Sequence, residues 1–146
     1  MALRVSPHEL GLTPGTARVW GVIMDSVFSD GDWYSLVVFA EGTTSLYTSG
    51  TFAVIGAGGH PEVRTASDKC LAVADQELDA FHGTGDTSLP PRNHVAIRVH
   101  TFDGLRVVIA EENELGYGRH AASTVFHAAH AVITAVRQAA ESSGES

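Results

Sequence analysis

The chain has 146 residues, of which 44% are hydrophobic and 18% are charged, and its formal net charge is −8 at pH 7. This composition is typical of one globular domain and excludes a disordered or fibrous chain. A chain with a negative net charge repels the backbone of a nucleic acid. The first residues lack the apolar core of a signal peptide, and no hydrophobic run approaches the roughly 20 residues of a membrane helix. We therefore expect a cytoplasmic protein that binds neither nucleic acid nor membrane.

The first third of the chain predicts three strands. Residues 1–17 contain two prolines and two glycines, which favour an irregular N-terminal segment. Residues 18–28 are rich in β-branched and aromatic side chains and predict the first strand. The near-continuous hydrophobic run 33–40, a Glu-Gly turn and residues 43–55 predict two further strands, paired as a hairpin.

The rest of the chain predicts two helices on either side of a second hairpin. Hydrophobic residues recur at helical spacing over 61–81, with a proline at the first position, where a helix tolerates it. Residues 94–102 and 105–112 flank an Asp-Gly turn and predict the hairpin. A hydrophobic stripe predicts the second helix over 121–140, and the polar residues 141–146 predict a disordered tail.

These elements predict a single domain over residues 18–140 with the order β-β-β-α-β-β-α. Two amphipathic helices on one face of a five-stranded antiparallel sheet would bury every hydrophobic stripe, so the predicted class is α+β. The stretches GAGGH (56–60) and GYGRH (116–120) share the pattern Gly-x-Gly-x-His, and each lies between a hairpin and a helix. They indicate a β-β-α unit used twice. The alternative is convergence, because glycine is the usual residue where a strand bends sharply into a helix.

The same two glycine stretches are candidate ligand sites. A dinucleotide fingerprint needs Gly-x-Gly-x-x-Gly, but Pro61 stands in place of the third glycine, and no Gly-Lys-Ser/Thr follows to form a Walker loop. Free N–H groups at a helix start can still hold an anion, and the alternative is a plain turn. The candidate anion-binding residues are Gly56, Gly58, Gly59, His60, Gly116, Gly118, Arg119 and His120.

Histidines on the second predicted helix are candidate metal ligands. At about 100° per residue, His120, His127 and His130 lie opposite the hydrophobic stripe, with Thr134 continuing the row, and His127 and His130 are spaced to share a metal. No acid or cysteine completes a known spacing, so we predict no metal site; the alternatives are a solvated polar face or a face that meets another subunit. No Gly-x-Ser-x-Gly motif is present, and the single cysteine, Cys70, lies on a hydrophobic stripe and is predicted to be a core residue. We predict no catalytic residue and no cofactor.

The run 33–40 carries large hydrophobic side chains on both faces of its strand. One face can pack under the helices, whereas the other would meet water, and an exposed patch of that size is usually covered by another protein. We therefore predict a homodimer whose interface includes Trp33, Val37 and Phe39. The first functional hypothesis is a non-enzymatic protein-interaction module, which also presents its loops to a partner protein. The second is an anion-binding protein or enzyme with its site at the glycine stretches.

Two long segments carry a resemblance to other proteins. Residues 30–64, DGDWYSLVVFAEGTTSLYTSGTFAVIGAGGHPEVR, and 100–137, HTFDGLRVVIAEENELGYGRHAASTVFHAAHAVITAVR, resemble segments of small uncharacterised bacterial proteins. The resemblance implies a bacterial family without a known activity, so no catalytic residue is carried over from it. By element order the chain also resembles two other groups, the roadblock and longin-like dimerisation domains and the type III secretion chaperones, which are small acidic dimers. It differs from roadblock domains in having three predicted strands, not two, before the first long helix.

Overall fold

The computed structural model describes residues 11, 18–50, 53–54, 56–84 and 88–142. The predicted irregular segment 1–17 therefore lies outside the described residues, apart from Gly11. None of the helices in the described part of the chain combines the length and the hydropathy that crossing a membrane requires.

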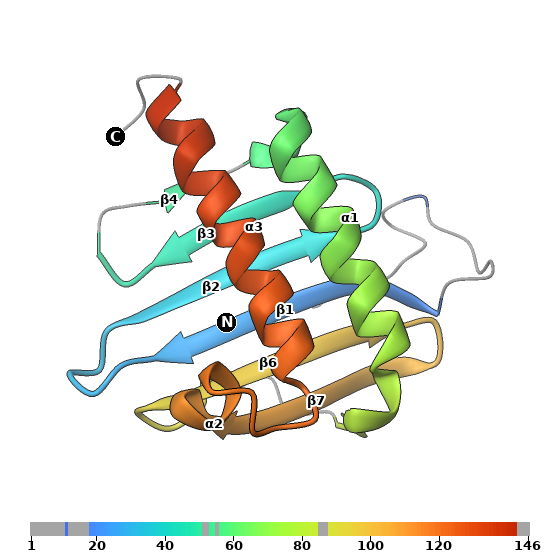
Figure 1. The fold of residues 1–146 in the computed structure, drawn as a ribbon, viewed down its shortest axis with the longest axis vertical. Coiled ribbons are helices and arrows are strands. Elements are labelled where there is room, and N and C mark those ends of the chain that lie inside the picture. Colours follow the sequence, from blue (N-terminus) through green and yellow to red (C-terminus); the bar gives the residue numbers. More distant parts are fainter. Residues whose placement is uncertain (1–10, 12–17, 51–52, 55, 85–87, 143–146) are drawn as a thin grey trace.

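The described strands form one antiparallel sheet (Figure 1). They are β1 (Val19–Val27), β2 (Trp33–Phe39), β3 (Thr44–Thr48), β4 (Ala53–Val54), β5 (His82–Gly83), β6 (His94–Thr101) and β7 (Gly104–Glu111). Their order across the sheet is β4-β3-β2-β1-β6-β7-β5. The α+β class and the antiparallel sheet are thus confirmed. The predicted number of five strands is wrong because β4 and β5 are two residues long, too short for a periodic pattern to indicate.

The predicted third strand, residues 43–55, is two strands in the structure. Strand β3 ends at Thr48 and the chain turns back, so that β4 pairs antiparallel with β3 and Val54 lies opposite Leu46. Gly50 lies between the two strands.

Two long helices cover one face of the sheet. The described helices are α1 (Pro61–Gln76), α2 (Glu112–Gly116) and α3 (Ser123–Ser142), with short 3-10 helices η1 (Ala57–Gly59) and η2 (Leu78–Ala80). Helices α1 and α3 lie side by side across the same face, as predicted (Figure 1). The prediction of two helices missed α2, which is a little more than one turn long and has no stripe of its own. Helix α3 extends to Ser142, so the predicted tail 141–146 begins inside a helix.

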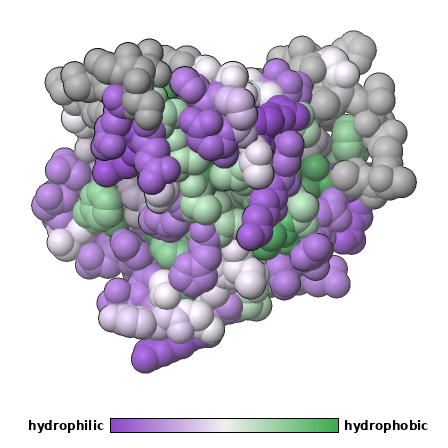
Figure 2. Space-filling view, turned by 45° about the horizontal axis from the view of Figure 1, so that its top comes forward, coloured by the Kyte–Doolittle hydropathy of each residue, from purple (hydrophilic) through white to green (hydrophobic). Residues whose placement is uncertain are grey.

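The main core lies between this face of the sheet and the stripes of α1 and α3. Val22 and Met24 of β1 and Leu36 of β2 are fully buried there, together with Cys70 of α1. Burial raises the pKa of the Cys70 thiol to about 12, which confirms Cys70 as a core residue. On the outer surface, hydrophobic residues gather towards the middle of the view in Figure 2, and hydrophilic residues surround them.

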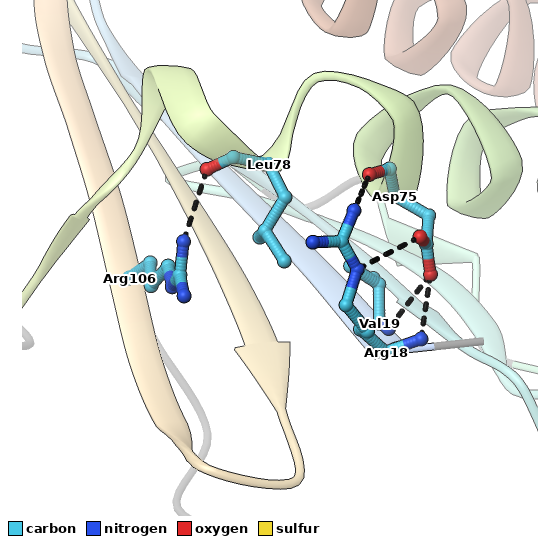
Figure 3. A network of polar contacts seen from close by, with 5 residues as sticks. All are labelled: Arg18, Val19, Asp75, Leu78 and Arg106. Atoms are coloured by element: carbon cyan, nitrogen blue, oxygen red, sulfur yellow. Dashed lines mark hydrogen bonds and ion pairs between the residues drawn. The ribbon is translucent and has the colours of Figure 1, made fainter. Parts of the chain in front are cut away.

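Asp75 fastens α1 to the beginning of β1 (Figure 3). Its carboxylate accepts hydrogen bonds from the backbone N–H groups of Arg18 and Val19, at 2.7 and 3.1 Å, and from the Arg18 guanidinium at 3.3 Å. The Arg18 side chain also donates to the Asp75 carbonyl oxygen at 2.8 Å. Partial burial acts to raise the pKa of Asp75, but these hydrogen bonds and the Arg18 charge outweigh it and hold the pKa below its ordinary value. A second contact in the same view, from Arg106 to the Leu78 carbonyl, joins β7 to η2.

The second face of the sheet has a buried cluster of its own. Trp20, Ile23, Val37 and Phe39 pack together there and are at most 3% exposed. Val37 and Phe39, which we predicted to be interface residues, are therefore core residues of the single chain. The prediction of an open hydrophobic face is wrong at these two positions.

A buried ion pair explains why this second face is not simply hydrophobic. Arg98 Nη1 donates to Asp25 Oδ2 at 3.0 Å, and both side chains are fully buried. The Ser35 hydroxyl donates to the other carboxylate oxygen of Asp25, and Arg98 also donates to the carbonyl of Ser88, in the segment before β6. Because a buried charge needs polar partners, this network fixes β1, β2 and β6 against that segment.

Candidate ligand-binding cleft

A cleft of about 500 Å³ lies between the start of β2, the end of β3 and one side of α3. Its hydrophobic lining comes from Phe28 in the β1–β2 turn, Trp33 of β2, Leu46 of β3 and Ile133 of α3. Trp33, the third predicted interface residue, is thus a half-buried wall of this cleft. The volume falls within the range of small-molecule sites, and such sites combine a hydrophobic lining with a few convergent polar groups.

Three polar groups of the cleft come from one side of α3. His130, Thr134 and Arg137 are spaced by four and three residues, which places them on the same side of the helix. Tyr34 reaches them from β2, where it lies opposite Ser26 on the face that the helices cover.

Tyr34 and His130 make the central contact of the cleft. The Tyr34 hydroxyl lies 3.2 Å from His130 Nε2 and the two rings meet edge-on, although 96 residues separate them in the chain. The Phe126 ring supports His130 from the other side, with 4.4 Å between the ring centroids. The two polar atoms are therefore held in place by aromatic packing from β2 and α3.

Both central groups are uncharged at neutral pH. Burial raises the pKa of Tyr34 to about 12. Burial also lowers the pKa of His130, and the neighbouring His127 lowers it further. A phenol and a neutral imidazole can each donate and accept a hydrogen bond, so the pair can bind either a hydrogen-bond donor or a hydrogen-bond acceptor of a ligand.

Three charged groups line the cleft. They are Asp32 in the β1–β2 turn, Glu112, the first residue of α2, and Arg137 of α3. Burial is the main cause of the raised pKa of Tyr34; a hydrogen bond with Ser26 lowers this pKa, the charge of Glu112 raises it and the charge of Arg137 lowers it. The cleft thus combines hydrophobic walls, a neutral hydrogen-bonding pair, two acids and one base.

The first glycine stretch is a tight corner against the β2–β3 turn. A Cβ atom on Gly58 would lie 1.9 Å from the carbonyl oxygen of Gly42, so only glycine fits there. Gly56 has a left-handed φ of 74° and donates its N–H to the Ser45 hydroxyl. His60 is the N-cap of α1 but makes no side-chain capping bond, and an acid, Glu62, occupies the first turn. This geometry explains Gly58 by packing and Gly56 by its left-handed backbone, and it adds no support for an anion at Gly56, Gly58, Gly59 or His60.

The second glycine stretch differs from the first in conformation. Gly116 ends α2, and Gly118, with φ of 75°, follows it, whereas in the first stretch the leading glycine is the left-handed one. Arg119 lies 5.2 Å above the Tyr117 ring. The His120 ring accepts the Ala122 N–H at 3.0 Å, in the turn before α3. The two Gly-x-Gly-x-His stretches therefore share a sequence pattern but differ in backbone conformation.

The structure separates the two histidines that were considered as metal ligands. His127 is exposed, while His130 turns to Tyr34 in the cleft. Within the described ranges, no three His, Cys, Asp or Glu side chains are grouped so that they could hold a metal ion.

Comparison with known proteins identifies no relative of this chain. No protein-family model, curated protein or solved structure matches the chain. The resemblance to small bacterial proteins and the homodimer both stay predictions. What can be said of function rests on the cleft.

Sequence reasoning found one central residue of the cleft and missed the others. His130 and Thr134 belong to the polar row that was noted on the second helix, whereas Tyr34, Glu112 and Arg137 were not predicted to be site residues. The available signal was Tyr34 itself, a polar-tipped residue at a position whose alternate neighbours face the helices. Nothing in the periodicity, however, says which residue of α3 lies across from it.

Proposed function

We propose that the protein binds a small amphipathic ligand in the cleft between β2, β3 and α3. One observation carries the proposal: the Tyr34 hydroxyl and the His130 imidazole converge, 3.2 Å apart, inside a hollow of about 500 Å³ with hydrophobic walls. A ligand with an apolar body and one hydrogen-bonding group matches this lining.

The test uses prodan, a neutral fluorescent naphthalene ketone whose emission shifts to the blue in apolar surroundings. Prodan titrated into the full-length protein should give a saturable blue shift. Thr134→Trp places a large side chain in the cleft and should weaken binding at least tenfold, about 1.4 kcal/mol. Thr124→Trp is the matched control, because Thr124 is also an exposed threonine of α3 but does not line the cleft. Equal affinity in the wild type and Thr134→Trp would contradict the proposal.

The interaction-module hypothesis remains a separate proposal with its own test. Val37 and Phe39 offer no exposed surface in the single chain, so a homodimer would have to use other residues. Light scattering at micromolar concentration gives the mass directly: twice the chain mass would support the homodimer, and the mass of one chain would contradict it.

A further inference from the structure

A second hollow, of about 260 Å³, continues the cleft towards the end of α2. Glu112 and His130 line both hollows, so these two residues form the boundary between them. The other residues that line the smaller hollow are Tyr117, Phe126 and two residues of α2, Asn113 and Gly116. A ligand in the larger hollow can therefore extend past Glu112 without leaving the surface depression.

The boundary between the two hollows combines a carboxylate with aromatic rings. Glu112 is half-buried there, and its charge contributes to raising the pKa of Tyr34, after the larger effect of burial. Tyr34 and Phe126 both contact the His130 ring, which burial keeps uncharged. A half-buried carboxylate attracts a cation by its charge.

Two further observations favour a cation over an anion. The larger hollow is lined by two carboxylates, Asp32 and Glu112, and by one guanidinium, that of Arg137. The chain as a whole carries a net charge of −8, which raises the local concentration of cations. Arg137 lines the larger hollow but not the smaller one.

We propose that the ligand is an organic cation, an amine or quaternary ammonium group on an apolar body. The positive group lies at Glu112, beside His130, and the apolar body lies in the larger hollow against Trp33 and Phe28. This inference rests on the proposed function, because it assigns the ligand class of the same cleft.

The experiment compares benzyltrimethylammonium with benzyl alcohol, which carries a similar ring without the charge. Calorimetric titration of the full-length protein should show at least tenfold tighter binding of the cation. Glu112→Gln should reduce the affinity for the cation at least fivefold and leave that for benzyl alcohol within twofold. Glu114→Gln is the matched control, since Glu114 lies on the same short helix and lines neither hollow. It should leave both affinities unchanged.

The outcomes separate this inference from the proposed function. Binding of benzyl alcohol as tight as that of the cation, or an unchanged cation affinity in Glu112→Gln, overturns the cation assignment and leaves the cleft as a ligand site. An equal loss in Glu112→Gln and Glu114→Gln also overturns it, because the effect is then one of overall charge. Binding of neither compound, together with no effect of Thr134→Trp on prodan, overturns both proposals.

Discussion

Protonation of His100 should destabilise the protein as the pH falls below 6.5. His100 lies on β6 and is 7% exposed, with the Trp20 ring 4.8 Å away and the Phe39 ring 6.1 Å away. Its Nε2 atom has no hydrogen-bond partner among the residues that the structure describes. Burial, and then the Arg98 charge, lower the pKa of His100 from 6.5 to about 4.

The size and direction of the effect follow from this pKa. The folded state binds the proton less tightly than the unfolded state, so the full contribution to stability is present above pH 6.5 and is lost as the pH falls towards 4. The whole difference corresponds to about 3 kcal/mol of unfolding free energy, of which about 2 kcal/mol is lost between pH 7 and pH 4.5.

Urea unfolding followed by circular dichroism at pH 7 and pH 4.5 measures this loss. His100→Phe keeps a ring of similar size and removes the titrating group, so its unfolding free energy should fall about 2 kcal/mol less than that of the wild type over this interval. His82→Phe serves as the control, because His82 is exposed on β5, and it should behave as the wild type does. If His100→Phe and the wild type lose equal stability, the account of His100 as a buried neutral ring is refuted.

Two further predictions concern stability. Asp75→Asn should lower the unfolding free energy at pH 7 by about 1–2 kcal/mol, because it weakens the hydrogen bonds between α1 and the beginning of β1. The control is Asp68→Asn, which removes an exposed ion pair and should lower the unfolding free energy by less than about 0.5 kcal/mol. Since the pKa of Asp75 is held below 3.8, this contribution is present above about pH 4 and disappears as the pH falls further; a difference from the wild type that persists unchanged at pH 2 would contradict it. Gly58→Ala should cost more than about 2 kcal/mol, because its Cβ would lie 1.9 Å from the carbonyl of Gly42, while Gly59→Ala, which points into open space, should stay within about 0.5 kcal/mol. The urea midpoints of unfolding measure the effects of Gly58→Ala and Gly59→Ala. Equal midpoints for these two variants would show that Gly58 is not tightly packed against the β2–β3 turn.

Residue patterns predicted most of the long elements. The β-branched run 18–28 contains β1, the Asp-Gly turn joins β6 and β7, and the hydrophobic stripes indicate α1 and α3 on one face. The patterns failed where an element is too short to have a period, as in β4, β5 and α2. Helix α1 also ends earlier than its stripe, at Gln76, because the chain continues as the 3-10 turn η2.

The strand 33–40 shows why the second face of the sheet was misjudged. The alternation of its residues correctly placed Leu36 and Val38 on one face of β2 and Val37 and Phe39 on the other face. Alternation reports the face of a side chain but says nothing of what lies over that face. The buried Arg98 and its contact to the segment before β6 were needed to show that this face is interior.

The sequence by itself determined the class, the hairpins β2–β3 and β6–β7 and the sides that α1 and α3 turn to the core, because these follow from turn residues and from local periods of two and 3.6 residues. Only the tertiary structure decided that Tyr34 meets His130, 96 residues away, and that Glu112 stands between two hollows. Such contacts depend on sheet register and helix packing. Both are set by the whole core rather than by any short stretch of the chain.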